Sequence, residues 1–244
     1  MRILAFIPAR AGSMSIENKN MALLDGEPLI SYCIEALKHT DITERVCSTD
    51  SAPVANLARR KGLTVVDRPK HLRGPIVPIV KVIKNFVETN YGQDEERPDA
   101  ILLVQPTSPF VTPYQIQTLV GMLSAEPDAQ SAQTICKVPH NFHTWNQRTL
   151  SPNKQVAWIY PQRSWAYNKE SKPASYKFGN LVLTRTAAII QGEMFPTPSL
   201  GLEISLFDSI DVDGQNDLDM AEALVQAGVL GMWTDNYENG EEEE

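Results

Sequence analysis

The chain has 244 residues, of which 42% are hydrophobic and 21% charged, and its formal net charge is −8. These proportions are typical of a globular protein with a sizeable core, and the negative charge argues against a general nucleic-acid binder. No stretch of about 18 apolar residues could span a membrane, and no leader peptide precedes the first strand-like run, so we expect a cytoplasmic protein.

Short apolar runs alternate with amphipathic segments along most of the chain. The runs predict strands at residues 3–7, 45–48, 63–66, 100–104, 131–138 and 177–185, with 201–212 extended as well. The segments predict helices at 28–37, 54–61, 76–91, 113–124 and 217–227. This alternation predicts an α/β, Rossmann-like fold, in which a mostly parallel, doubly wound sheet is covered by helices on both faces.

The expected organisation is one domain over residues 1–230. Residues 139–175, where both patterns weaken, are predicted to be an insertion that forms a lid or a dimer arm. The acidic residues 231–244 predict a disordered tail. Cys33 and Cys47 lie in apolar surroundings and are predicted to be buried, and no cysteine–histidine cluster indicates zinc.

Polar loops follow several of the predicted strands, and in a parallel sheet such loops meet at one edge. The loop after strand 3–7 carries a glycine and several polar residues, among them Arg10, Ser13, Lys19 and Asn20. A triphosphate requires positive charge, hydroxyl and amide donors, and a close approach of the backbone. The alternative interpretation is an ordinary polar loop after a strand.

The loop after strand 100–104 presents Gln105, Thr107 and Ser108 between two prolines. The prolines stiffen the loop, so these side chains are held in fixed positions. Such a display suits a polar ligand such as a sugar, and a plain strand-ending turn is the alternative.

Asp211 and Asp213 lie in an acidic stretch near the end of the chain. If the stretch is extended, both carboxylates project from the same face. Two carboxylates beside bound phosphates suit Mg²⁺. The alternative is a helix cap, which is the role that we assign to Asp217 and Asp219.

Two weaker candidates have structural interpretations. Ser48, Thr49 and Asp50 are predicted to cap the helix that follows them while lying near the same edge of the sheet. His140 and His143 are three residues apart, but no third ligand is close in sequence, so a structural role is favoured over a metal site.

In chain order, the stretches IPARAGS, KN, CSTDS, DRP, LLVQPTSPF and FDSIDVD resemble the acylneuraminate cytidylyltransferase family, over residues 3–224. These enzymes activate sialic acids and related nonulosonic acids as CMP-sugars, and the KN pair resembles this branch more than the Kdo cytidylyltransferases. The resemblance implies one domain of the nucleotide-diphospho-sugar transferase type, a homodimer with an exchanged arm, CTP and Mg²⁺ as requirements, and release of pyrophosphate.

The resemblance also implies roles by position. The residues implied to contact CTP are Arg10, Ser13, Lys19 and Asn20, with Arg68 near the base. Those implied or expected to contact the sugar are Gln105, Thr107, Ser108, Lys169 and Lys177. Asp211 and Asp213 would hold Mg²⁺, and the predicted catalytic residues are Arg10, Lys19 and Asp211.

The chain departs from the family's pattern at several positions. Met14 stands where a lysine usually follows the serine of the first loop, and Val111 stands where an arginine is common. Pro75 and Ile79 replace polar residues that would face the nucleotide, and Gly179-Asn180 inverts the family's Asn-Gly pair.

We therefore predict an enzyme that transfers CMP from CTP to the anomeric hydroxyl of a nonulosonic acid, mainly by positioning and charge neutralisation. One alternative is a catalytically impaired nucleotide- or sugar-binding relative, which Met14 and Val111 favour. Another is a nucleotidyltransferase for a different sugar acid.

Overall fold

The computed structural model describes residues 1–12, 15–92, 96–161 and 168–228. Its centre is a seven-stranded sheet with the strand order β11-β7-β10-β6-β1-β4-β5. The strands are β1 (Ile3–Ala9), β4 (Glu44–Thr49), β5 (Thr64–Asp67), β6 (Ala100–Val104), β7 (Ser131–Lys137), β10 (Tyr176–Arg185) and β11 (Ser199–Ile204). All are parallel except β10, which is antiparallel to its neighbours β6 and β7. The predicted mostly parallel, Rossmann-like sheet is confirmed.

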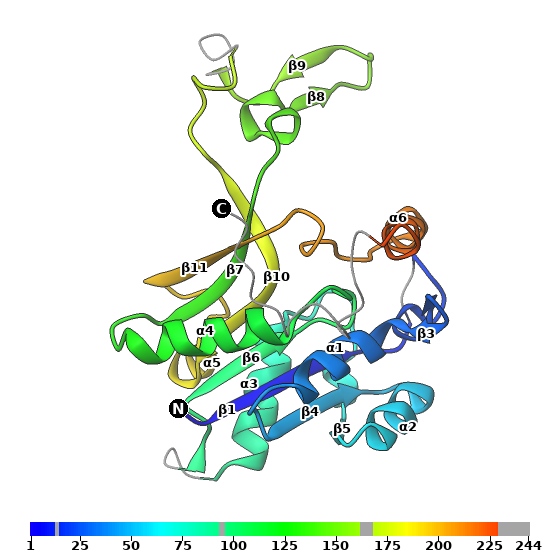
Figure 1. Cartoon of the computed structure of the whole chain (residues 1–244), viewed down its shortest axis with the longest axis vertical. Coiled ribbons are helices and arrows are strands. Elements are labelled where there is room, and N and C mark those ends of the chain that lie inside the picture. The colour runs from blue at the N-terminus through cyan, green and yellow to red at the C-terminus, as the bar shows by residue number, and fades with distance from the viewer. Residues whose placement is uncertain (13–14, 93–95, 162–167, 229–244) are drawn as a thin grey trace.

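Six α-helices accompany the sheet in the described part of the chain (Figure 1). They are α1 (Leu29–Lys38), α2 (Ala52–Arg60), α3 (Ile79–Asn90), α4 (Pro113–Ala125), α5 (Thr186–Gln191) and α6 (Gln215–Gln226). Two small hairpins complete the fold, β2 (Leu23–Leu24) with β3 (Glu27–Pro28) and β8 (Arg148–Leu150) with β9 (Val156–Trp158). Short 3-10 turns include η1 (Lys19–Met21) and η2 (Lys70–Leu72).

Strand β1 shows how the core is divided between the two faces of the sheet. Ile3, Ala5 and Ile7 join the apolar cluster that contains residues of α1, α2 and α4, whereas Leu4 and Phe6 join the cluster with α3 and α5. Side chains alternate across a strand, so a strand buried on both faces reads as a continuous apolar run. The apolar start of the chain is therefore the centre of a three-layer α/β/α structure.

The parallel strands also bring four polar residues to one edge. Arg10, Asp50, Arg68 and Gln105 each directly follow the last residue of β1, β4, β5 and β6, respectively. These four strands are adjacent and parallel, so the loops that leave them start side by side. The predicted convergence of these loops is confirmed.

Helix α6 joins the last part of the chain to this edge. It lies beside the β2–β3 hairpin (Figure 1). A third apolar cluster contains Leu24, Phe110, Val212 and Ala221, and it fixes the stretch before α6 against the loop after β6. This packing places the acidic end of the domain next to its basic beginning.

Several predicted boundaries are wrong. Helix α3 begins at Ile79, not at residue 76, because Pro78 disfavours the helical conformation in the residue before it. The segment 201–212 is not one extended piece, since β11 ends at Ile204 and residues 206–209 form a turn. Helix α5 was not predicted, because six residues are too few to show a helical period.

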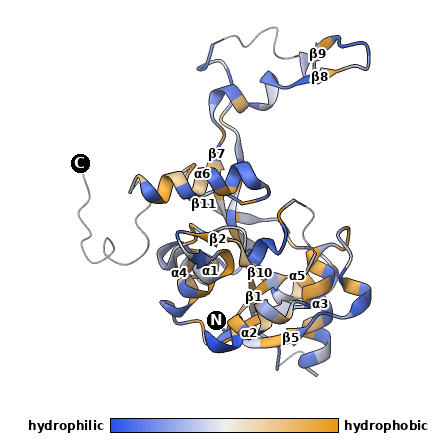
Figure 2. Ribbon diagram, turned by 90° about the vertical axis from the view of Figure 1, so that its right-hand side faces the viewer, coloured by the Kyte–Doolittle hydropathy of each residue, from blue (hydrophilic) through white to orange (hydrophobic). Residues whose placement is uncertain are grey.

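The segment between β7 and β10 projects away from the sheet and carries the β8–β9 hairpin, as Figures 1 and 2 show. His143 at its base is buried, with Nε2 3.1 Å from the carbonyl oxygen of Pro173, while Nδ1 accepts the N–H of Trp145 at 3.1 Å. These bonds give His143 a structural role. The predicted tail, 231–244, lies outside the described residues.

Among the described helices, none combines the length and the apolar character needed to cross a membrane.

Candidate active site

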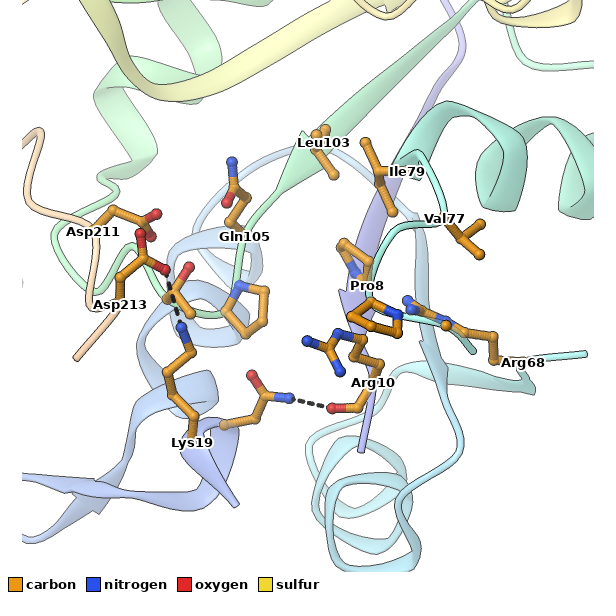
Figure 3. A pocket seen from close by; sticks show the side chains of 15 residues that line it. Pro8, Arg10, Lys19, Arg68, Val77, Ile79, Leu103, Gln105, Asp211 and Asp213 are labelled. Atoms are coloured by element: carbon orange, nitrogen blue, oxygen red, sulfur yellow. Dashed lines mark hydrogen bonds and ion pairs between the residues drawn. The ribbon is translucent and has the colours of Figure 1, made fainter. Parts of the chain in front are cut away.

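A pocket of about 320 Å³ opens at the carboxyl edge of the sheet (Figure 3). It is lined by Pro8, Arg10, Lys19, Asn20, Arg68, Gly74, Pro75, Val77, Ile79, Leu103, Gln105, Pro106, Thr107, Asp211 and Asp213. Eight of these are predicted site residues, and they come from stretches that span almost the whole chain: Arg10, Lys19, Asn20, Arg68, Gln105, Thr107, Asp211 and Asp213. The fold therefore brings the basic first loop and the acidic stretch into one cavity.

The first loop is fixed by Asp50 at the end of β4. Its carboxylate accepts the backbone N–H of Ala11 at 2.7 Å, so Asp50 holds the loop and does not cap α2. The N-cap of α2 is Ser51, which makes no side-chain cap bond, and the predicted capping role is therefore wrong. Asn20 donates to the carbonyl of Arg10 at 3.1 Å and closes the loop from its other end. Ser13 and Met14 lie outside the described residues.

Arg10 and Lys19 contribute the positive charge of the first loop. Arg10 Nη1 donates to the carbonyl of Gly12 at 2.8 Å, so its guanidinium is held over the loop by the loop's own backbone. Lys19 Nζ lies 3.1 Å from Asp213 Oδ1. The lysine side chain is 13% exposed and that of Asp213 is 81% exposed, so the ion pair stands at the boundary between pocket and solvent.

Asp211 lies deeper in the site than Asp213. Ser108 donates its hydroxyl to Asp211 Oδ1 at 3.3 Å, and the N–H of Val212 donates to the carbonyl of Thr107 at 2.8 Å. Burial raises the pKa of Asp211, and the nearby charge of Asp213 adds to this, while the Thr107 and Ser108 hydroxyls and Lys19 act in the opposite direction. A buried carboxylate of this kind is stabilised by an additional cation.

The route by which the two aspartates reach the pocket differs from the prediction. The structure has no strand at residues 211–213, so the period-two argument does not apply there. Instead, the bond between Val212 and Thr107 fixes the irregular backbone, and Asp211 and Asp213 on either side of it both line the pocket. Asp217 accepts the backbone N–H groups of Asp213 and Gly214 at 3.0 and 2.8 Å, as expected of a residue at a helix start.

Arg68 is the most buried cation of the pocket, at 4% exposure. Its Nη2 donates to the carbonyl of Ser48 at 3.4 Å, and its Nε has no hydrogen-bond partner among the described residues. Burial lowers the pKa of Arg68, while the charge of Asp50 raises it and that of Arg10 lowers it. A buried N–H that is unpaired in the free protein indicates a position where a ligand acceptor is needed.

One wall of the pocket is apolar. Pro75, Val77, Ile79 and Leu103 line it. Val77 and Ile79 lie on the side of Arg68, opposite the aspartates (Figure 3). Pro75 and Ile79 were expected to face the ligand in place of polar residues, and both line the cavity. This wall suits the flat face of a base better than it suits a phosphate.

The loop after β6 contributes its polar residues unequally. Gln105 and Thr107 line the pocket, whereas Ser108 is almost fully buried and acts through its bond to Asp211. Val111, which replaces a common arginine, is completely buried in the core under α4. The valine at this position therefore contributes packing rather than charge.

Lys169 and Lys177 do not line this pocket. Lys177 Nζ donates to the carbonyl of Ser209 at 2.9 Å, so it holds the backbone before Asp211. Lys169 lies on the projecting segment and lines another hollow, with Lys137 and Lys172. The structure thus separates these two lysines from the eight residues that it brings together.

Sequence reasoning missed three contributors. Asp50 was interpreted as a helix cap, although a carboxylate directly after a parallel strand is a signal for a loop-holding residue. Val77 and Leu103 fell within a predicted helix and a predicted strand without a role of their own, and only the tertiary structure shows that they face the cavity.

The donor set of the site is suited to a hard cation. Within the described ranges no cluster of three or more histidine, cysteine or acidic side chains could hold a metal ion by itself. Asp211 and Asp213 supply two carboxylates, and Mg²⁺ typically takes one or two such ligands and completes its shell with water and phosphate oxygens. The residues present fit Mg²⁺ bound together with a phosphate ligand.

Comparison with known proteins gives matches over most of the chain. The family model described as "Cytidylyltransferase" matches residues 4–208. The CMP-N,N'-diacetyllegionaminic acid synthase of Legionella pneumophila is 32% identical over 232 residues, which cover 93% of this chain and 97% of that protein. The N-acylneuraminate cytidylyltransferase of Escherichia coli O18:K1:H7 is 35% identical over 229 residues, and the match covers 92% of this chain but only 52% of the relative.

Solved structures agree on the fold. A CMP:2-keto-3-deoxy-manno-octonic acid synthetase complexed with CTP superposes with a TM-score of 0.69 at 14% identity, covering 93% of this chain and all of the other. The 4-diphosphocytidyl-2C-methyl-D-erythritol synthase of Anaerococcus prevotii gives a TM-score of 0.61 at 13% identity, covering 92% and 96%. At these identities the likeness concerns the fold alone.

Proposed function

Because this chain belongs to the cytidylyltransferase family, we propose that it transfers CMP from CTP to the anomeric hydroxyl of a sialic-acid-like nonulosonic acid. The observation that carries the proposal is the meeting of Arg10, Lys19 and Arg68 with Asp211 and Asp213 around one cavity. In the reaction the anomeric oxygen bonds to the α-phosphorus of CTP as the bond from that phosphorus to the bridging oxygen breaks. Pyrophosphate leaves with the bonding electrons, and the hydroxyl proton is released.

The triphosphate is assigned to the first loop. Arg10, Lys19 and Asn20 line the pocket, and Ser13, outside the described residues, is part of the same assignment. In the free protein Arg10 is bonded to a loop carbonyl and Lys19 to Asp213, so triphosphate oxygens replace these partners on binding. The two cations then offset the charge that develops on the leaving pyrophosphate.

Asp211 and Asp213 are assigned to Mg²⁺. Bound there, the ion would supply charge neutralisation and orientation of phosphate oxygens. The protein's contribution is to keep two carboxylates at the pocket wall: Asp211 through Ser108, and Asp213 through the backbone bonds that Asp217 accepts.

The base is assigned to the apolar wall beside Arg68. A pyrimidine ring packs against Val77, Ile79 and Leu103, and its carbonyl oxygen accepts a hydrogen bond from the Arg68 guanidinium, whose Nε is unpaired in the free protein. The apolar contacts and the buried donor together exclude water from the base.

The acceptor sugar is assigned to Gln105 and Thr107, which line the polar side of the pocket, while the predicted contact of Ser108 is replaced by its bond to Asp211. Lys169 remains a candidate for the sugar carboxylate, and Lys177 acts on the site through the carbonyl of Ser209. A nonulosonic acid is supported by the Legionella relative, whose name specifies diacetyllegionaminic acid and whose length the match covers almost completely.

A homodimer is part of the proposal. Both strands of the β8–β9 hairpin are exposed along their whole length, including Leu150, Val156 and Trp158 at 69%, 64% and 44%. A projecting hairpin with apolar side chains is costly in a monomer, and a second copy of this chain would cover it. A cytoplasmic location, where CTP is present, completes the proposal.

The direct test is pyrophosphate release from CTP, Mg²⁺ and a panel of nonulosonic acids, with mass spectrometry of the CMP-sugar. We expect release with at least one acid, and none when the acid is omitted. ATP in place of CTP is the control for base selection. Tight CTP binding without release across the panel would overturn the proposal.

A further inference from the structure

The antiparallel strand β10 is irregular where it passes the acidic loop, which we define as residues 205–213. Its pairing with β7 shifts register between Phe178 and Val182. Gly179 makes this close approach feasible, because a Cβ there would lie 2.5 Å from Thr134 Oγ1 and 2.9 Å from Ile204 Cδ1. The glycine of the inverted Gly179-Asn180 pair is therefore required by packing.

Asn180 lies within this irregular part of β10, and its side chain contacts the acidic loop. It is 1% exposed, and its side-chain amide donates to the carbonyl of Asp208 at 2.9 Å and to Gln115 Oε1 at 3.0 Å. Its own Oδ1 accepts the Thr134 hydroxyl at 2.9 Å. All the hydrogen-bonding groups of this side chain are thus in use in a dry environment, where each bond is costly to lose.

Gln115 links the same network to the loop after β6. It is 4% exposed and lies in the first turn of α4, where its Oε1 also accepts the backbone N–H of Thr112 at 3.3 Å. The backbone N–H of Thr112 can only donate, so the atom of Gln115 that faces it must be the amide oxygen Oε1. The same oxygen faces Asn180, which must therefore donate to it through its NH₂ group. The orientation of the Asn180 amide is fixed, and its second hydrogen points at Asp208.

The acidic loop and the loop after β6 are therefore joined at two levels. Asn180 and Gln115 join them at the base, and the bonds from Val212 to Thr107 and from Ser108 to Asp211 join them at the pocket. Only the upper level contains residues that belong to the site described above.

We propose that Asn180 is a positioning residue that keeps Asp211 aimed into the pocket by holding the acidic loop through Asp208 and Gln115. The expected effect of Asn180 on turnover rests on the proposed function, whereas its expected effect on the acidic loop does not. Without the Asn180 amide, the loop loses a buried bond three residues before Asp211, and the carboxylate pair loses its fixed spacing.

The test compares Asn180→Ala with the wild type by Mn²⁺ binding, followed by electron paramagnetic resonance, in the presence of CTP and without any acceptor sugar. We expect Mn²⁺ affinity to fall by about tenfold or more, as is usual when a group that orients a metal ligand is removed. In the metal-free protein, amide hydrogen exchange in residues 205–213 should become faster. Turnover should fall mainly in kcat, and the Mg²⁺ concentration needed for the half-maximal rate should rise, with a smaller change in KM for CTP.

Thr184→Ala is the matched control. Thr184 lies on the same strand, is completely buried, and donates its hydroxyl to the carbonyl of Met194 at 2.7 Å, outside the pocket. This variant should lose thermal stability while retaining Mn²⁺ affinity. If both variants lose Mn²⁺ affinity equally, the effect is general destabilisation and the proposal is wrong.

A double variant shows whether Asn180 acts through Asp211. In an Asp211→Asn background, Asn180→Ala should cause no further loss of Mn²⁺ affinity, because the carboxylate that it positions is gone. The same loss in both backgrounds would overturn the proposal. If Asn180→Ala does not fold, Gln115→Met removes one acceptor of the network and should shift Mn²⁺ affinity in the same direction, and unchanged affinity would contradict the inference.

The outcomes separate this inference from the proposed function. Absence of pyrophosphate release by the wild type would defeat the proposed function, yet the Mn²⁺ and exchange measurements would still test Asn180. Normal turnover by the wild type with unaltered Mn²⁺ binding in Asn180→Ala would defeat the inference alone.

Discussion

Lys19 Nζ and Asp213 Oδ1 lie 3.1 Å apart although 194 positions separate the two residues in the chain. The pair joins the first loop to the acidic loop across the mouth of the pocket, and the Ser15 hydroxyl also donates to the carbonyl of Asp213. A lysine that is paired with a carboxylate can exchange this partner for a phosphate oxygen at small net cost. In the free protein Lys19 and Asp213 thus neutralise each other's charge.

Replacing Lys19 by methionine should reduce kcat/KM for CTP by about 10- to 100-fold, since a charge-assisted bond to phosphate contributes about 1.5–3 kcal/mol. Steady-state pyrophosphate release measures the effect. Lys38→Met is the control, because Lys38 forms a comparable ion pair with Glu35 at 3.0 Å on the surface of α1. Equal losses in the two variants would argue against a phosphate role for Lys19.

Asp211→Asn should abolish most turnover, by about 100-fold or more, because a preorganised charge of the site is lost. The same change should stabilise the metal-free protein at neutral pH. Burial raises the pKa of Asp211, so the folded state binds the proton more tightly than the unfolded chain, and ionisation at neutral pH opposes folding. Thermal unfolding in EDTA measures this, and a lower melting temperature for the variant would contradict the assigned environment.

Arg68→Met should weaken CTP binding without destabilising the free protein. The variant removes a buried charge whose Nε is unpaired, so the free protein should be as stable as the wild type or more so. Its affinity for CTP should fall by about tenfold or more, through the lost donor. Calorimetric titration with CTP and thermal melts measure the two effects, and Arg59→Met, exposed on α2, is the control.

Because Cys47 is buried, we expect the free energy of unfolding to decrease in alkaline solution. Burial raises the pKa of this thiol to about 12, well above the value of about 8.5 in an unfolded chain. Its contribution to stability is therefore complete below about pH 8.5 and declines as the pH rises toward 12, by up to about 1.4 kcal/mol per pH unit. Urea unfolding between pH 7 and pH 10 should show a shallower decline in Cys47→Ala than in the wild type. Identical slopes would mean that the thiol is not buried as described.

The exposed hairpin predicts the oligomeric state. Leu150→Asp combined with Val156→Asp should convert a dimer into a monomer, because the charges would have to be buried at the interface. Light scattering after size-exclusion chromatography measures the mass. Lys154→Asp, in the turn between β8 and β9, tests whether added negative charge alone has this effect. A wild-type monomer would refute the homodimer.

The pattern of apolar residues along the chain was sufficient to predict most strands of the sheet. Ile3, Leu4 and their neighbours in β1 form an unbroken apolar run because both faces of the strand are covered, and β6 reads the same way. The residues that directly follow these strands could then be placed at one edge without coordinates, since parallel strands end together. The sequence by itself thus determined the fold class and the meeting of Arg10, Arg68 and Gln105.

Only the tertiary structure decided how the far end of the chain enters the site. No sequence period marks the turn after β11. Asp211 and Asp213 are held at the pocket by long-range bonds, in which the Asn180 amide donates to the carbonyl of Asp208 and the N–H of Val212 donates to that of Thr107. The contacts of Lys177 and the two-sided role of Leu103 were equally hidden. Period and propensity report on neighbours in the chain, whereas these contacts join segments that meet only when the sheet is formed.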